Sequence, residues 1–86
     1  MKVYILYHPQ SDHARQVEEF AHDYESRKDK SVDLLSLETR EGAAMASLYD
    51  IVSYPAILAV RNDGQLLKVW QGETMPLMDE VSAYSD

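Results

Sequence analysis

Side chains with catalytic or metal-binding potential gather in one short stretch near the start of the chain, at His8, Ser11, Asp12 and His13. Histidine and carboxylate ligands suit zinc or nickel. A metal site, however, needs three or four converging ligands, and the spacing of these residues matches no closed motif. We therefore predict no metal site and no cofactor in this chain.

Nucleophilic catalysis by Ser11 would need a general base within reach. Helix positions i and i+2 do not face each other, so His13 is poorly placed and His8 is the only candidate base. No third group that could orient His8 is visible, so the logic of a catalytic triad is unmet. We predict that Ser11 instead caps the following helix, as serine often does, and that the chain has no catalytic residue.

Composition limits the function further. The 86 residues are 45% apolar, include no cysteine and carry a formal net charge of −7. A chain without cysteine supplies no thiolate, which excludes thiol-disulfide oxidoreductase activity. The acidic balance argues against nucleic acid and anionic membranes as partners. No apolar run approaches the ~20 residues that span a bilayer, and the first residues turn polar too soon for a signal peptide. We expect a single cytoplasmic domain over residues 1–86.

The first half of the chain predicts a strand, a helix and a second strand. The unbroken apolar run from Val3 to Tyr7 is typical of a central strand that is covered on both faces. Residues 32–37 predict a strand parallel to the first, because the connection between the two is long. Between them, apolar side chains at helical spacing predict a helix that packs on a sheet: Ala14, Val17, Phe20, Ala21 and Tyr24.

The second half predicts a helix, a hairpin and a final helix. The Asp63-Gly64 pair favours a hairpin between strands at residues 56–60 and 66–70, with a type I′ turn whose two central residues both have positive φ. Thr39 and Thr74 are candidate helix caps. The faces expected to pack are Ala44, Leu48 and Ile51 in the earlier helix, which ends near Asp50, and Leu77, Val81 and Tyr84 in the last helix. The element order is therefore βαβαββα.

The most specific signal is the segment Tyr49-Asp50-Ile51-Val52-Ser53-Tyr54-Pro55-Ala56-Ile57-Leu58-Ala59-Val60. This segment, followed by Asn62-Asp63-Gly64 and Trp70-Gln71-Gly72, resembles thioredoxins and glutaredoxins, and the likeness extends over nearly the whole chain. In that family the second helix leads through a short loop to a cis-proline, a hydrophobic strand and a tight hairpin. The resemblance implies an α/β thioredoxin-like fold with a four-stranded mixed sheet flanked by three helices, and it identifies Pro55 as the cis-proline.

The sequence departs from the family at the start of the first helix. Redox-active relatives carry a Cys-x-x-Cys motif there. Aligned by the end of the first strand and by the apolar helix face, the two cysteine positions correspond to Ser11 and Ala14, with Asp12 and His13 between them. The resemblance therefore implies the fold and its cleft without the redox chemistry.

The resemblance also suggests where a partner would bind. In the family, the backbone just before the cis-proline pairs with an extended peptide. In this sequence that position is Tyr54, and we expect His8, Pro9 and Ser11 to complete a peptide-binding cleft with Tyr54 and Pro55. The leading prediction is a non-redox module that binds a protein or peptide and is a monomer or weak homodimer.

Two other functions stay open. The first is a glutathione- or anion-binding enzyme without cysteine, since the serine of some glutathione transferases contacts the sulfur of glutathione. Those enzymes resemble this chain only in their first domain. The second is a regulatory assembly protein similar to the circadian KaiB family, which is small and thioredoxin-like, has a proline-bearing segment after its second helix and does not require the redox pair.

Overall fold

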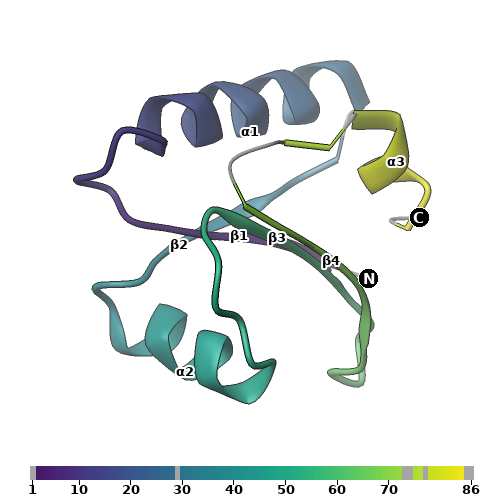
Figure 1. Ribbon diagram of the computed structural model, residues 1–86. Coiled ribbons are helices and arrows are strands. Elements are labelled where there is room, and N and C mark those ends of the chain that lie inside the picture. Colours follow the sequence, from purple (N-terminus) through teal and green to yellow (C-terminus); the bar gives the residue numbers. More distant parts are fainter. Residues whose placement is uncertain (1, 29, 73–74, 77, 85–86) are drawn as a thin grey trace.

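A mixed four-stranded sheet lies between helices in the computed structural model, which describes residues 2–28, 30–72, 75–76 and 78–84 (Figure 1). Helices α1 and α3 cover one face of the sheet, and α2 covers the other. The elements are β1 (Lys2–Tyr7), α1 (Ala14–Lys28), β2 (Asp33–Ser36), α2 (Arg40–Leu48), β3 (Ala56–Val60), β4 (Leu66–Gln71) and α3 (Met78–Ser82). This order confirms the prediction βαβαββα.

The strands are arranged in the order β2-β1-β3-β4. β1 is parallel to β2 and antiparallel to β3, and β3 and β4 form an antiparallel hairpin. The central position predicted for β1 is confirmed, because Val3 and Ile5 pack on the α1 face while Leu6 packs on the α2 face. Side chains alternate between the two faces of a strand, so one apolar run serves two cores.

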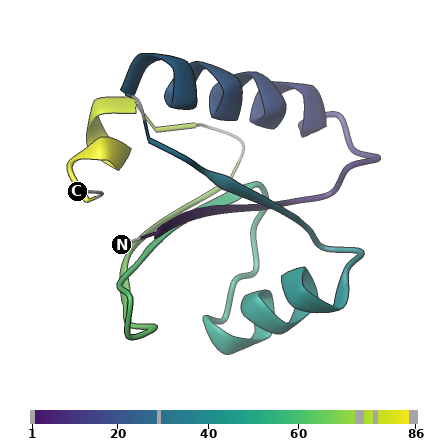
Figure 2. The same ribbon diagram turned by 180° about the vertical axis from the view of Figure 1, so that it is seen from behind.

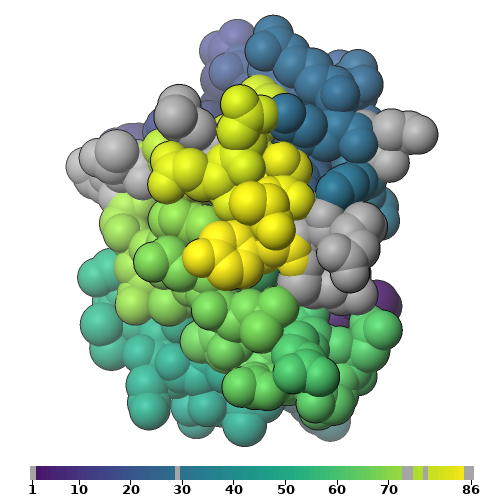
Figure 3. All heavy atoms as spheres, turned by 90° about the vertical axis from the view of Figure 1, so that its right-hand side faces the viewer, coloured from purple at the N-terminus to yellow at the C-terminus, as the bar shows by residue number. Residues whose placement is uncertain are grey.

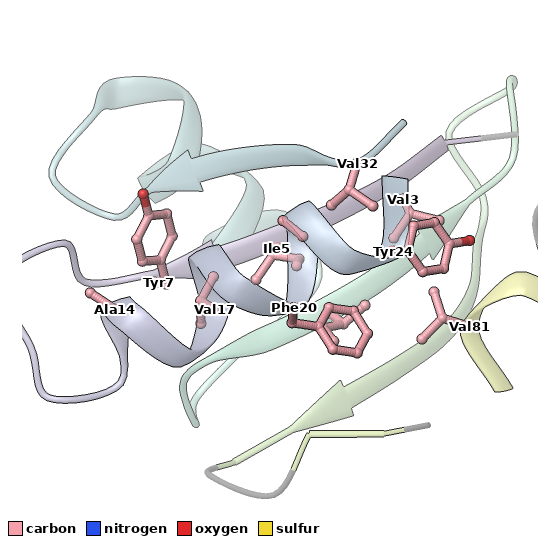
Figure 4. Packing of buried hydrophobic residues seen from close by; sticks show 11 residues of the cluster. Val3, Ile5, Tyr7, Ala14, Val17, Phe20, Tyr24, Val32 and Val81 are labelled. Carbon is pink, nitrogen blue, oxygen red and sulfur yellow. The ribbon is translucent and has the colours of Figure 1, made fainter. Parts of the chain in front are cut away.

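The face covered by α1 holds the larger core (Figure 4). The five apolar α1 residues predicted to face the sheet are all buried there. Phe20 and Tyr24 stack with their ring centroids 6.1 Å apart. Val81 of α3 is fully buried in the same cluster and closes its open end. The helical spacing therefore predicted this core correctly.

The face covered by α2 is built differently from the predicted one. Thr39 caps the helix as expected, since its side chain accepts a hydrogen bond from the Gly42 N–H at 3.0 Å. Ala44 and Leu48 are exposed, however, whereas Ile51, which follows the end of the helix at Leu48, is buried as predicted. The buried helix residues are Gly42 and Ala46. Gly42 sets this orientation, because a Cβ atom at its position would lie only 2.0 Å from the Ser36 carbonyl oxygen.

The β3–β4 hairpin is present, but its turn is not type I′. Gly64 has φ of +93°, whereas Asp63 is not among the described residues with positive φ. The Gly64 N–H donates to the Arg61 carbonyl at 2.9 Å, and the Arg61 N–H donates to the Gln65 carbonyl at 2.8 Å. A turn followed by one left-handed glycine explains this geometry, so only Gly64 leaves the ordinary backbone regions.

Helix α3 lies between the end of α1 and the β3–β4 hairpin, as the yellow, blue and green atoms of Figure 3 show. Val81 is buried as predicted. Tyr84 is 37% exposed, and its ring meets the edge of Trp70 at a centroid distance of 5.6 Å. Thr74 and Leu77, which we predicted as a cap and a packing residue, lie outside the described residues. No helix in the described part of the chain is long and apolar enough to cross a membrane.

Candidate functional site at the proline loop

Ser11 in the turn after β1 and Ala14 at the start of α1 are the two positions that we predicted to correspond to the cysteines of a Cys-x-x-Cys motif. The Ser11 N–H and the Ser11 hydroxyl both donate to the His8 carbonyl, at 3.1 and 2.6 Å. Helix α1 begins only at Ala14, where the His13 carbonyl accepts the first helical hydrogen bond from Val17. The prediction that Ser11 caps α1 was therefore wrong. The serine is used one turn earlier, to close the loop.

The two histidines of this turn lie next to each other. The His8 N–H donates to the His13 Nε2 at 3.2 Å, and the two ring centroids are 6.2 Å apart. A nitrogen that accepts this bond carries no proton itself. The Ser11 hydroxyl, in turn, is directed at a backbone carbonyl rather than at an imidazole nitrogen. The pairing of nucleophile and base that a serine hydrolase needs is thus not formed by these residues.

The loop from Ile51 to Pro55 is held by side-chain hydrogen bonds. The Gln71 Oε1 of β4 accepts the N–H groups of Val52 and Ser53 at 3.1 and 3.2 Å. The Tyr54 hydroxyl donates to the Ile51 carbonyl at 2.9 Å. Pro55 is buried, and the peptide bond between Tyr54 and Pro55 is cis, the isomer that the resemblance implied.

His8 and Tyr54 bring the two loops together. Their rings meet edge to face with centroids 5.3 Å apart. Pro9 and Ser11 are half-buried on the turn that carries His8. A separate hollow at the start of α1 is lined by Ser11, Asp12, His13 and Gln16, and Tyr54 and Pro55 do not line it. The predicted cleft residues therefore lie on neighbouring surfaces that meet at the contact between His8 and Tyr54.

The sequence did not point to three features of this site. Gln71 anchors the loop, but a glutamine at the end of a strand has no distinctive pattern. Leu48, which we predicted to pack in the interior, is 71% exposed, and Val52 is 81% exposed. Asp50 adopts φ of +55° at the end of α2, a conformation that aspartate tolerates better than most residues. That turn leads the chain into the proline loop.

Two observations describe the titratable groups near the site. Among the described residues, no three His, Asp or Glu side chains are grouped so that they could hold a metal ion. Burial raises the pKa of the Tyr7 hydroxyl, and the negative charge of Glu18 raises it further. Tyr7 is thus neutral at physiological pH and cannot serve as a base there.

Comparisons with known proteins identify the fold. The sequence matches no family model and no curated protein. Among solved structures, the chain is similar to thioredoxin 1 from the thermophilic eubacterium Thermosipho africanus TCF52B, with a TM-score of 0.68 and 10% sequence identity. The similarity covers 98% of this chain and 89% of that chain. The fold is therefore thioredoxin-like, and these residues contain no Cys-x-x-Cys motif.

Proposed function

We propose, from a thioredoxin-like fold in a chain without cysteine, that this domain is a non-redox module that binds an extended protein or peptide segment at the proline loop. The observation that carries the proposal is the backbone of Tyr54. Among the described residues, no group accepts from its N–H or donates to its C=O. The neighbouring N–H groups of Val52 and Ser53 are already bonded to Gln71. One donor and one acceptor thus remain for a partner strand, which is the pairing used in β-augmentation.

The surroundings of Tyr54 support the same role. Leu48 and Val52 offer exposed apolar surface at the end of α2 and in the loop that follows it. His8 packs its ring against Tyr54 and so holds the neighbouring turn beside it. A partner segment could therefore combine backbone hydrogen bonds at Tyr54 with apolar contacts to Val52. Pockets for alternate side chains give such interfaces their specificity.

Selection of a displayed library of random, unstructured peptides on the folded domain tests the proposal. We expect enriched peptides to bind the wild-type domain, to shift the Tyr54 amide resonance, and to lose most of their affinity for a Val52→Asp variant. Leu67→Asp, at a residue 38% exposed on β4, is the matched control and should bind normally. A library without enriched peptides, or peptides that bind both variants equally, would refute the proposal. Reduction of insulin by dithiothreitol should not exceed the uncatalysed rate.

Glutathione binding is the alternative that the same resonances can test. The hollow at the start of α1 includes the Asp12 carboxylate, which opposes an anionic ligand, and the Ser11 hydroxyl is directed at the His8 carbonyl. We therefore expect no shift at Ser11, Tyr54 or residue 56 when glutathione is added. Saturable shifts at these residues would favour the anion-binding enzyme over the peptide-binding module.

A further inference from the structure

The outer edge of β2 has unpaired backbone groups. β2 is an edge strand that pairs only with β1, and Figure 2 shows it in front of the sheet, with α1 above it and α2 below. The Leu37 N–H donates to the Tyr7 carbonyl of β1, which fixes the direction of alternate backbone groups. Groups of Val32, Leu34 and Ser36 must then point away from the sheet, because successive residues of a strand bond to opposite sides.

The chain itself uses only the two ends of this edge. The Val32 N–H donates to the Glu25 Oε2 at 3.0 Å. The Ser36 carbonyl accepts from the Thr39 N–H at 3.1 Å and from the Thr39 hydroxyl at 2.7 Å. Among the described residues, nothing bonds to the Val32 carbonyl, to either backbone group of Leu34, or to the Ser36 N–H. Donors and acceptors are therefore left open at the centre of the strand.

We propose that β2 pairs with β2 of a second copy of this chain, antiparallel and around a two-fold axis at Leu34. In this register the Leu34 N–H and C=O of each copy exchange hydrogen bonds with those of the other. The Ser36 N–H of each copy donates to the Val32 carbonyl of the other. These bonds use only open groups. The Val32 N–H also lies opposite the Ser36 carbonyl of the other copy, but both of these groups are already bonded within their own chain, to Glu25 and to Thr39. The open pattern is thus complementary to itself.

Side chains select the same register. Opposed residues of an antiparallel pair lie on the same face of the sheet, so even-numbered residues must meet even-numbered ones. Two Leu34 side chains, each 36% exposed in the single chain, then cover each other on the α1 face. A shift of the axis to Leu35 would instead set the open Leu34 N–H against the occupied Ser36 carbonyl.

The opposite edge of the sheet is not suited to such pairing. The ladder between β3 and β4 contains a register shift, where Ala59 pairs with Lys68 but Val60 pairs with Leu66. Bulges and exposed lysines are the devices that protect sheet edges from pairing with other chains. β2 has neither device within its Asp-Leu-Leu-Ser run. The edge that can pair is therefore β2.

Charge opposes the association and gives it a characteristic salt dependence. Each Asp33 faces Leu35 of the second copy, and the two Asp33 residues become diagonal neighbours, with Cα atoms roughly 7–8 Å apart. Each chain also carries a formal charge of −7. We therefore expect a weak dimer that strengthens as added salt screens the repulsion. Asp33→Asn should lower the dissociation constant by roughly two- to fivefold.

Analytical ultracentrifugation of the whole chain over a range of protein and salt concentrations tests the proposal. The dimer fraction should rise with protein concentration and with salt concentration, and it should be larger for Asp33→Asn than for wild type. The association constant should fall at least tenfold in Leu34→Lys, where two lysines would meet. Leu67→Lys on β4 is the matched control and should behave as wild type. Circular dichroism checks that each variant is folded.

Amide hydrogen exchange on the unaltered chain gives a second readout that needs no variant. Exchange at Leu34 and Ser36 should slow as protein concentration rises, while exchange at Leu67 should not change. A monomer at every concentration up to the solubility limit would overturn the proposal. So would a dimer that survives Leu34→Lys and leaves the Leu34 amide unprotected, because that dimer would use another surface.

Discussion

The two faces of the sheet are stabilised in different ways. On one face, α1 has fifteen residues and buries large side chains, among them Phe20 and Tyr24. On the other, α2 has nine residues and buries only Gly42 and Ala46 among its own. Helix α1 contributes side-chain volume, whereas α2 contributes close backbone approach and hydrogen bonds, and the large buried side chains on its face, such as Leu6, Ile51 and Leu58, come from the strands and the loop. Side-chain changes should therefore be costly in α1, and backbone changes in α2.

This difference bears on the proposed function. The loop that carries Tyr54 follows α2, a helix that buries little apolar surface in the core. Leu48 and Val52 remain exposed there. The loop is nevertheless ordered by Gln71 and by the Tyr54 hydroxyl, so it presents apolar side chains on a fixed backbone. A preorganised surface of this kind loses less entropy when it binds.

Truncation in the α1 core should have the largest effect. Phe20→Ala removes a buried ring that stacks on Tyr24, and we expect the free energy of unfolding to fall by about 3–5 kcal/mol. Denaturant unfolding followed by circular dichroism measures the change. Leu48→Ala, on the exposed side of α2, is the control and should change stability by less than about 0.5 kcal/mol. Equal losses in the two variants would contradict the contrast between the faces.

Addition of a single methyl group tests the α2 face. In an ordinary helix interior, Gly→Ala stabilises by roughly 1 kcal/mol. At Gly42 the added Cβ would lie 2.0 Å from the Ser36 carbonyl oxygen and 2.8 Å from its carbon, so backbone must move. We expect Gly42→Ala to destabilise the fold by about 1–3 kcal/mol, a reversal of the usual sign.

The matched control for Gly42→Ala is the reverse change at the exposed neighbour, Ala43→Gly. We expect that variant to lose roughly 1 kcal/mol through helix propensity alone. Thermal or denaturant unfolding of both variants decides the question. A Gly42→Ala variant that is more stable than wild type would mean that α2 is not held by close backbone contact.

The contrast also explains what the sequence could predict. The α1 core was predictable because five large apolar residues repeat at helical spacing and all of them are buried. The same rule failed within α2, where Ala44 and Leu48 have the expected spacing but are exposed, although Ile51 beyond the helix end is buried as predicted. The burial of α2 is set by Gly42, which has no side chain to produce a hydrophobic pattern. Hydrophobic periodicity therefore predicts burial where large side chains fill the core, but not where a glycine lets two backbones approach.

The residues of the candidate site likewise fall into those that the sequence predicted and those that it did not. The residues of the proline loop were predictable because Tyr54-Pro55 sits in a recognisable order of helix, proline and strand. Ser11 was misassigned, since the preference of serine for helix caps does not fix where a helix begins, and the turn at residues 11–13 places the start of α1 at Ala14. Gln71 was not predicted at all. Its partners lie 18 and 19 residues away in sequence, so no local pattern connects them.

Loss of the α2 cap should have a moderate effect. The Thr39 hydroxyl accepts from the Gly42 N–H and donates to the Ser36 carbonyl, so it joins the helix to the end of β2. We expect Thr39→Ala to lower the free energy of unfolding by about 1 kcal/mol, and Thr39→Ser to keep most of that stability. Chemical denaturation measures both. A Thr39→Ser variant as unstable as Thr39→Ala would assign the effect to the lost methyl group instead of the hydroxyl.

The smallest effect is expected from the ion pair between Lys28 of α1 and Asp79 of α3, which adds a surface charge contact to the α1 face. The hydrogen bond from Lys28, and then its positive charge, lower the pKa of the Asp79 carboxyl. A carboxyl whose pKa is lower in the folded chain stabilises the fold above its unfolded pKa of about 3.9, and this contribution is lost as pH falls below that value. The difference in unfolding midpoint between wild type and Asp79→Asn should therefore be small near neutral pH and shrink toward pH of about 3. Thermal unfolding across this range measures it, with Glu38→Gln, at an exposed acidic residue, as the control for loss of a surface charge. A difference that grows on acidification would contradict the lowered pKa, and would leave the α1 face stabilised by side-chain volume alone.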